Sequence, residues 1–231
     1  MKLAIMQPYF FPYIGYFQLI HAADVFVVYD DVNFIKGSWI NRNYILSQGQ
    51  KTRITLQLQG ASSTRKIKDV RLGDNRKKLL KSIQQNYARA PQYSVVMPLI
   101  EEVITFDEPN LAKYLEYGIR EVGAYLGLSK RWVISSHLQK DSALRGQDKV
   151  LAICRELGAD HYINLPGGAG LYARNRFEQE NIQLSFIAPQ IIEYRQFGNK
   201  FEPYLSIIDI IMFNDRARCN QLLNGYVLVQ N

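Results

Sequence analysis

The amino-acid sequence predicts an α/β fold: a mainly parallel, Rossmann-like sheet with helices on both faces, plus an inserted antiparallel hairpin and a helical section. Two observations support this prediction. Short, continuous apolar segments of strand length recur along the chain, and segments with helical apolar spacing separate them. Strands that are apolar along their whole length are typical of parallel sheets, because helices cover both faces of such sheets.

The chain opens with a strand, a helix and a second strand. Residues 2–7 and 25–29 are mostly apolar, and residues 14–23 between them have helical apolar spacing. A buried strand, a crossover helix and a second buried strand form a βαβ unit, so we expect these two strands to be parallel.

The α/β pattern returns after Gly127. Three further strands are expected, at residues 132–136, 161–165 and 183–187. Helices are expected between them at residues 147–157 and at about 171–180. Residues 204–213 form either a final helix or an apolar segment packed against the sheet, and the pattern leaves both open.

Residues 36–127 are expected to form the insertion within a single domain that spans residues 1–231. The insertion begins with a hairpin of strands 39–46 and 53–59, because apolar and polar residues alternate in the second strand and a Ser-Gln-Gly-Gln turn precedes it. Three helices follow, at residues 75–89, 94–106 and 110–126.

The composition excludes several classes of protein. A chain of 231 residues that is 47% hydrophobic and 21% charged suits a folded core and not a disordered segment or a coiled coil. No apolar run approaches the roughly 18 residues that cross a bilayer, and the opening residues do not resemble a signal peptide. We therefore expect a cytoplasmic protein without an integral membrane span.

The two cysteines and three separated histidines fit neither a disulfide framework nor a metal site.

Positive charge is concentrated in one part of the chain. Residues 36–90 hold 13 Lys and Arg but only two acids, whereas the whole chain has a formal net charge of +7. Such a section predicts an anionic partner: a nucleotide, a sugar nucleotide, a tRNA or a phospholipid surface. The alternative is a solvated basic face without a ligand.

The loop after the first expected strand, residues 7–16, is the first candidate binding segment. In open α/β sheets, ligands bind beyond the carboxyl ends of the strands, where helix N-termini offer N–H groups to anions. Two prolines restrict the loop, and its rings could stack on a base or a sugar; the alternative is an aromatic plug over the core. The candidate ligand-binding residues here are Gln7, Tyr9, Phe10, Tyr13 and Gly15.

A glycine-rich turn at residues 165–172 again joins an expected strand to an expected helix. Glycines allow a backbone to approach a phosphate closely, although this turn is neither GxGxxG nor a P-loop. A structural tight turn is the alternative. Its candidate binding residues are Gly167, Gly168, Gly170 and Tyr172.

Polar side chains also follow two other expected strands, and the carboxyl ends of parallel strands share one edge of the sheet. We therefore expect Asp30 and Ser136 to line one cleft with Gln7, Tyr9 and Gly168. Asp30 and Asp31 end the second strand and could act as a general base or cap a turn. Ser135 and Ser136 end a later strand and are candidate ligand-binding hydroxyls. In the basic section, the candidate anion-binding residues are Lys36, Asn41, Arg42 and Asn43, because a guanidinium fork suits phosphate and carboxylate.

Together these residues resemble the WbqC-like proteins of bacteria. The resemblance extends over the whole chain and lies in residues 7–17 (QPYFFPYIGYF), 29–32 (YDDV), 41–43 (NRN), 135–136 (SS), 167–172 (GGAGLY), 194–196 (YRQ) and 201–209 (FEPYLSIID). The resemblance implies a role in the synthesis of O-antigen or another surface polysaccharide, with transfer of an amino acid such as glycine to a sugar.

We therefore expect a transferase that moves an acyl or aminoacyl group to a nucleotide- or lipid-linked amino sugar, with a sugar nucleotide bound at the loops and aminoacyl-tRNA as a possible donor. Asp30, Asp31 and Asp209 are the candidate catalytic carboxylates. One alternative is a non-catalytic module that binds nucleic acid or another anion through residues 36–90. A nucleotidyltransferase is disfavoured, because Tyr13 and Tyr16 stand where such enzymes carry histidines.

Overall fold

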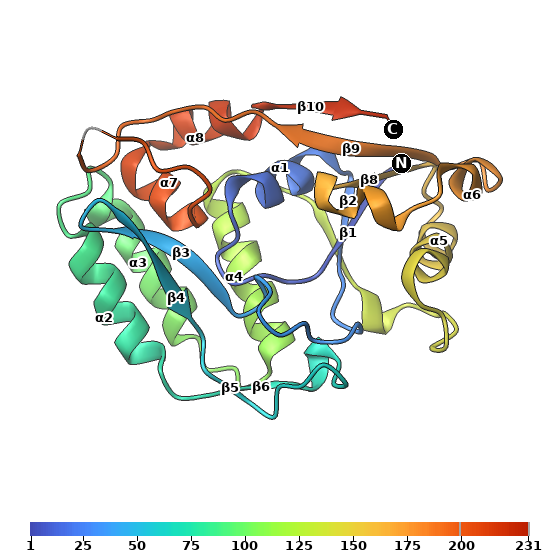
Figure 1. The fold of residues 1–231 in the computed structure, drawn as a ribbon, viewed down its shortest axis with the longest axis horizontal. Helices are drawn as coiled ribbons and strands as arrows, with labels where there is room; N and C mark the ends of the chain where they lie inside the picture. Colours follow the sequence, from blue (N-terminus) through green and yellow to red (C-terminus); the bar gives the residue numbers. More distant parts are fainter. Residues whose placement is uncertain (199, 231) are drawn as a thin grey trace.

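The computed structural model describes residues 1–198 and 200–230, which are arranged around a six-stranded sheet (Figure 1). The strand order is β10-β9-β8-β1-β2-β7. The five predicted strands are present and parallel to one another: β1 (Lys2–Met6), β2 (Val25–Val28), β7 (Arg131–Ile134), β8 (His161–Asn164) and β9 (Gln183–Pro189). The sheet also has a strand that we did not predict, β10 (Tyr226–Val229), which pairs antiparallel with β9 at the edge.

Helices cover both faces of this sheet, as predicted. Ala4 and Phe26 share a core with α1 (Ile14–Ala22). Leu3 and Val25, whose side chains alternate to the opposite face, share a second core with α5 (Gly146–Leu157) and α6 (Arg174–Glu178). The alternation of strand side chains therefore explains why every residue of β2 is buried.

The strand order changes direction between β1 and β8. From β1 the chain proceeds to β2 and then β7 on one side, and from there it crosses back to β8 and β9 on the other side. After β1 the chain passes to one face of the sheet, and after β8 it passes to the other face. A crevice therefore opens between the neighbouring carboxyl ends of these two strands. The loop after β1 and the glycine-rich turn after β8 both start at this point.

The hairpin of the insertion forms from β3 (Arg42–Ser47) and β4 (Gln50–Thr55), with Ser47 opposite Gln50. The predicted extension of its second strand to residue 59 is wrong. The side chain of Asn75 donates to the Thr55 carbonyl and accepts from the Gln57 amide, so it replaces the partner strand there. Beyond that point β5 (Leu58–Gln59) pairs with β6 (Arg71–Leu72).

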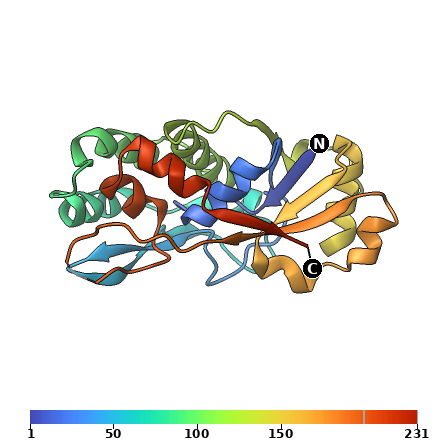
Figure 2. The same ribbon diagram turned by 90° about the horizontal axis from the view of Figure 1, so that it is seen from above.

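The predicted helices of the insertion are α2 (Arg76–Tyr87), α3 (Tyr93–Thr105) and α4 (Leu111–Tyr125). Figure 2 shows α2, α3 and the β3–β4 hairpin at one end of the molecule and α5 and α6 at the other. Near the C-terminus, α7 (Ile207–Phe213) resolves the open alternative in favour of a helix, and α8 (Arg216–Leu223) follows it without having been predicted.

The remaining short elements are 3₁₀ turns. They are η1 (Ile67–Asp69), η2 (Ser135–His137) and η3 (Pro166–Leu171). The strand expected to reach residue 136 therefore ends at Ile134, and the helix expected from about residue 171 starts at Arg174. In the part of the chain that the structure describes, no helix combines the length and the hydrophobicity needed to cross a membrane.

The end of α5 generates a prediction about stability. Gly158 terminates this helix in the left-handed region, with φ of 66° and ψ of 36°. A Cβ is disfavoured in this conformation, so we expect Gly158→Ala to lower the free energy of unfolding by about 1 kcal/mol in urea denaturation. Gly170→Ala is the control, because Gly170 has no positive φ and a Cβ there meets no atom within 4 Å. An equal loss of unfolding free energy in both variants would mean that the left-handed conformation of Gly158 is not the cause.

Candidate functional site

A cleft of about 620 Å³ lies at the crevice between the carboxyl ends of β1 and β8. Gln7, Tyr9 and Tyr13 of the first loop line it together with Gly167 and Gly168 of the glycine-rich turn. Further lining comes from the rings of Tyr29, Trp39, Tyr172 and Tyr204. The two loops therefore meet as the sequence analysis predicted, and they form a cleft whose walls are largely aromatic. We refer to it as the aromatic cleft.

Buried hydrogen bonds hold the first loop in place. The carbonyl of Phe11 accepts from Asn43 Nδ2 at 2.6 Å and from Ser206 Oγ at 2.8 Å. The next carbonyl, that of Pro12, accepts from the Ile207 amide at the start of α7 at 2.9 Å. Phe11 has a φ of 41°, a left-handed conformation that a side chain rarely adopts without such support. Asn43, which we had placed among the anion-binding residues, is buried and here positions the loop.

Two other residues of the loop have different roles from those predicted. Phe10 is only 1% exposed and belongs to the core, so its ring does not face a ligand in the cleft. Gly15 is buried at the start of α1, where an added Cβ would lie 2.4 Å from the Tyr13 ring. The absence of a side chain at this position therefore allows the Tyr13 ring to pack against the helix start.

The glycine-rich turn is organised by Asn164 at the end of β8. Its Oδ1 accepts from the Leu165 amide at 2.7 Å, and its Nδ2 donates to the hydroxyls of Tyr162 and Tyr172 at 3.0 Å each. A Cβ at Gly168 would lie 2.8 Å from this Nδ2, so close packing requires glycine there. Gly167, by contrast, has open space beside it.

The carboxylate of Asp30 faces a second cavity, of about 540 Å³, which lies between α4 and the ends of β2 and β7. Its oxygens accept from the Ser136 amide at 2.9 Å and from the Ser136 hydroxyl at 2.6 Å. We had expected Asp30 and Ser136 to share one cleft with Gln7, Tyr9 and Gly168. The structure divides these residues between two cavities, because the end of β2 directs Tyr29 into the aromatic cleft and Asp30 into the other.

This second cavity, which we call the polar cavity, has lining groups of both charge signs. Lys68, Lys113 and His137 line it together with an ion pair of 2.8 Å between Glu116 and Arg120. Burial raises the pKa of the Glu116 carboxyl, and the neighbouring guanidinium offsets only part of this effect. The cavity therefore offers groups of both charge signs to a ligand.

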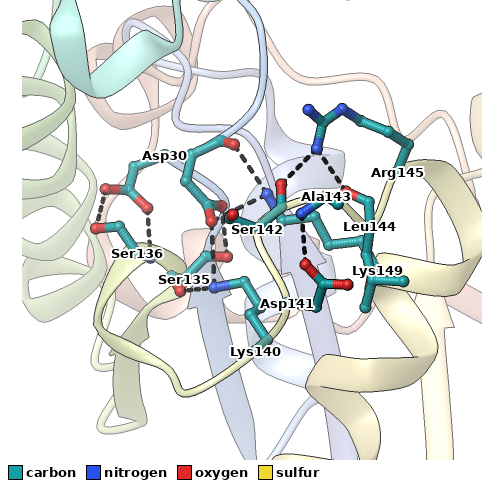
Figure 3. A network of polar contacts seen from close by, with 11 residues as sticks. Asp30, Ser135, Ser136, Lys140, Asp141, Ser142, Ala143, Leu144, Arg145 and Lys149 are labelled. Atoms are coloured by element: carbon teal, nitrogen blue, oxygen red, sulfur yellow. Dashed lines mark hydrogen bonds and ion pairs between the residues drawn. The ribbon is translucent and has the colours of Figure 1, made fainter.

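Asp31, next in sequence, has a different environment. Its carboxylate accepts from Ser135 Oγ at 2.7 Å and pairs with Lys149 at 2.9 Å and Lys140 at 3.1 Å (Figure 3). Burial opposes the charged form, but these hydrogen bonds and the two ammonium groups hold the pKa of Asp31 below its ordinary value. A carboxylate that is paired in this way is a poor general base, so Asp30 is the better candidate of the two.

Lys149 is itself buried and has no counterpart among the residues we predicted. Burial lowers the pKa of its ammonium group, and its Nζ also lies 5.1 Å from the Tyr29 ring centroid. The sequence contained a signal for this buried lysine, because Lys149 lies four positions before Ile153 on the apolar stripe of α5. A lysine on such a stripe needs a buried anion.

Asp209 lies apart from both cavities. It is fully buried on α7, where it accepts hydrogen bonds from Tyr87, Tyr194 and Gln196 at 2.7–2.8 Å. Burial raises the pKa of its carboxyl in spite of these donors. The structure thus does not bring Asp209 together with Asp30. The hydrogen bonds of Asp209 are those of a residue that holds α7 in place.

The basic candidates at the start of the insertion do not line the aromatic cleft or the polar cavity. Lys36 is exposed, and Arg42 lies beside Gly37. Asn41 donates to the carbonyl of Leu56, where the chain leaves the hairpin. Of the remaining candidates, Gly170 lies in η3 but outside the cleft lining.

The ion pairs of Asp31 generate a prediction about stability. Asp31→Asn leaves two buried ammonium groups without a countercharge, so we expect it to lower the free energy of unfolding by about 3–5 kcal/mol in urea denaturation. Lys149→Met should cost less, because Lys140 remains paired with the carboxylate. If Lys149→Met lowered the free energy of unfolding more than Asp31→Asn does, the proposed balance of charges would be wrong.

The same pair should depend on pH with a definite sign. Because the pKa of Asp31 is lowered in the folded state, its stabilising effect is present above pH about 4 and is lost as the pH falls through the folded-state value. The difference in unfolding free energy between wild type and Asp31→Asn should therefore shrink in acid.

Known proteins resemble this chain along almost its whole length. The model of the WbqC-like protein family matches residues 7–221. The chain is 27% identical over 228 residues to "Uncharacterized protein Rv1507c" of Mycobacterium tuberculosis, covering 96% of this chain and 97% of that protein. No solved structure matches the chain significantly. The family match spans nearly the whole chain, with both loops of the aromatic cleft and the two carboxylates that follow β2, so the chain belongs to the WbqC-like protein family.

Proposed function

We propose that the protein is a transferase that binds a nucleotide- or lipid-linked amino sugar in the aromatic cleft and adds an acyl or aminoacyl group to it. The convergence of the two loops at the point where the strand order reverses is the observation that carries this proposal. Ligands of doubly wound sheets bind at this place.

The lining of the cleft favours a ligand with flat, uncharged faces. Tyr9, Tyr13 and Trp39 offer ring faces on which a sugar or a base can stack. The hydroxyl groups of the tyrosines supply hydrogen bonds for sugar hydroxyls. A cleft of about 620 Å³ is within the usual range for a ligand of this size.

The ion network beside the cleft favours a phosphate group on the ligand. One carboxylate, Asp31, faces two lysines, so the group has an excess of one positive charge. Lys149 lies against the Tyr29 ring, and Tyr29 lines the aromatic cleft. This arrangement attracts the anionic part of a sugar nucleotide or of a lipid-linked sugar without placing a charged side chain in the lining.

In the proposed reaction, the amino sugar extends from the aromatic cleft past the end of β2 into the polar cavity, where Asp30 removes a proton from its ammonium group. The amine nitrogen then attacks the carbonyl carbon of an activated acyl ester. A C–N bond forms, the C–O bond of the ester breaks, and the leaving alcohol takes the proton that the attacking nitrogen loses. The hydroxyl and amide of Ser136 keep the Asp30 carboxylate oriented. Lys68 of the same cavity belongs to the basic section of residues 36–90, and this section suits an anionic donor such as an aminoacyl-tRNA.

The binding site can be tested by filling the cleft. A leucine at position 167 has room beside the backbone and projects from the cleft lining, so we expect Gly167→Leu to weaken binding of UDP-N-acetylglucosamine or a dTDP-linked amino sugar at least about tenfold by calorimetry. Gly170→Leu is the matched control, because Gly170 belongs to the same turn but does not line the cleft. Equal effects of the two substitutions would place the ligand elsewhere.

The role of Asp30 can be tested separately. We expect Asp30→Asn to lower the rate of aminoacyl transfer from glycyl-tRNA to a UDP-linked amino sugar about 100- to 10,000-fold, the usual contribution of a general base. Sugar binding should stay within about twofold of wild type, since Asp30 does not line the aromatic cleft. A variant that retains the wild-type rate would remove Asp30 from the mechanism.

A further inference from the structure

Four large hydrophobic side chains around the aromatic cleft are exposed to solvent. Ile35 is 53% exposed, Trp39 47%, Leu171 71% and Tyr204 60%, and all four line this cleft. We call them the apolar rim. They come from three separate segments of the chain, so the rim is a product of the fold and not of one apolar stretch. Exposed apolar groups that gather in one place mark an interaction surface.

The charge around the rim has a single sign. Within the described residues, no carboxylate lines the aromatic cleft or the adjoining cavity of about 310 Å³ that Trp39 and Tyr204 share with Lys51. Lys51 is exposed on β4 and its Nζ lies 5.1 Å from the Tyr44 ring centroid, while the same ring lies 5.9 Å from that of Trp39. Lys36, also exposed, follows the rim residue Ile35 directly in the chain.

We propose that the apolar rim docks on the surface of an anionic lipid bilayer, with the aromatic cleft opening toward the lipid headgroups. Tryptophan and tyrosine favour the bilayer interface, aliphatic side chains enter the acyl boundary, and lysines beside them pair with anionic headgroups. The basic section of residues 36–90 supplies Trp39 and both lysines, so two of its 13 Lys and Arg residues lie at this surface.

The composition of the rim favours a bilayer over other partners. Ile35 and Leu171 have no ring face for a nucleobase, so a nucleic acid would leave them without a contact. A rigid protein partner would cover the mouth of the cleft. A fluid bilayer satisfies both the aliphatic and the basic groups and still delivers a lipid-linked ligand to the open cleft. The inference goes beyond the proposed transferase reaction and requires no sugar to be bound.

Tryptophan fluorescence provides the direct test. The chain has two tryptophans, so the variant Trp132→Phe leaves Trp39 as the reporter. We expect its emission to shift to shorter wavelength when vesicles of equimolar phosphatidylglycerol and phosphatidylcholine are added, and to stay unchanged with phosphatidylcholine alone. Sedimentation of the wild-type protein with the same vesicles gives the partition coefficient without any substitution.

Two matched pairs of variants identify the surface. Ile35→Ser with Leu171→Ser should weaken partitioning about tenfold or more, whereas Val95→Ser, at an equally exposed apolar position on α3, should leave it unchanged. Lys36→Gln with Lys51→Gln should weaken it about fivefold per lysine, more than Lys77→Gln with Lys78→Gln, which removes the same charge from α2.

Other results would overturn the proposal. Equal partitioning to both kinds of vesicle, or equal losses in the test and control variants, would mean that the rim does not contact lipid. Binding of a short RNA that the rim substitutions leave intact would assign the basic section to nucleic acid. Self-association that the rim substitutions abolish would assign the rim to a second copy of the chain. All of these measurements are made without a sugar ligand, so failure here leaves the proposed contents of the cleft untouched.

Discussion

The aromatic cleft depends on one buried acceptor, the carbonyl of Phe11. Asn43 on β3 and Ser206 before α7 both donate to it, and the adjoining Pro12 carbonyl accepts from the first amide of α7. A buried carbonyl without a partner costs about 1–3 kcal/mol, so these donors stabilise the left-handed turn of the loop. The strand β3 of the insertion and the helix α7 thereby determine where Tyr9 and Tyr13 lie relative to the sheet.

The sheet topology then determines what the loop meets. Because the strand order reverses between β1 and β8, the loop after β1 faces the turn after β8, although the two are separated by about two thirds of the chain. At the end of the neighbouring strand β2, consecutive side chains alternate in direction, so Tyr29 and Asp30 line different cavities. Binding and proton transfer are thus assigned to adjacent compartments in the mechanism that we propose.

The ion network of Asp31, Lys140 and Lys149 adjoins the cleft. Its carboxylate is needed because two ammonium groups are buried, and one of them, that of Lys149, lies against the Tyr29 ring at the cleft. Buried charges of this kind add little net stability compared with apolar residues of the same size. In the function that we propose, their contribution is the electrostatic potential at the edge of the cleft.

The sequence alone determined the five parallel strands, the helices between them and the two loops, because these follow from local periodicity and from the position of strand ends. It missed β10, α8 and the end of β4, whose extents depend on partners distant in the chain, such as β9 and Asn75. It also could not distinguish Asp30 from Asp31, which are neighbours of identical chemistry. Only the tertiary structure decided between them, because the ammonium group that neutralises Asp31 comes from a residue 118 positions away and the strand turns Asp30 to the other side.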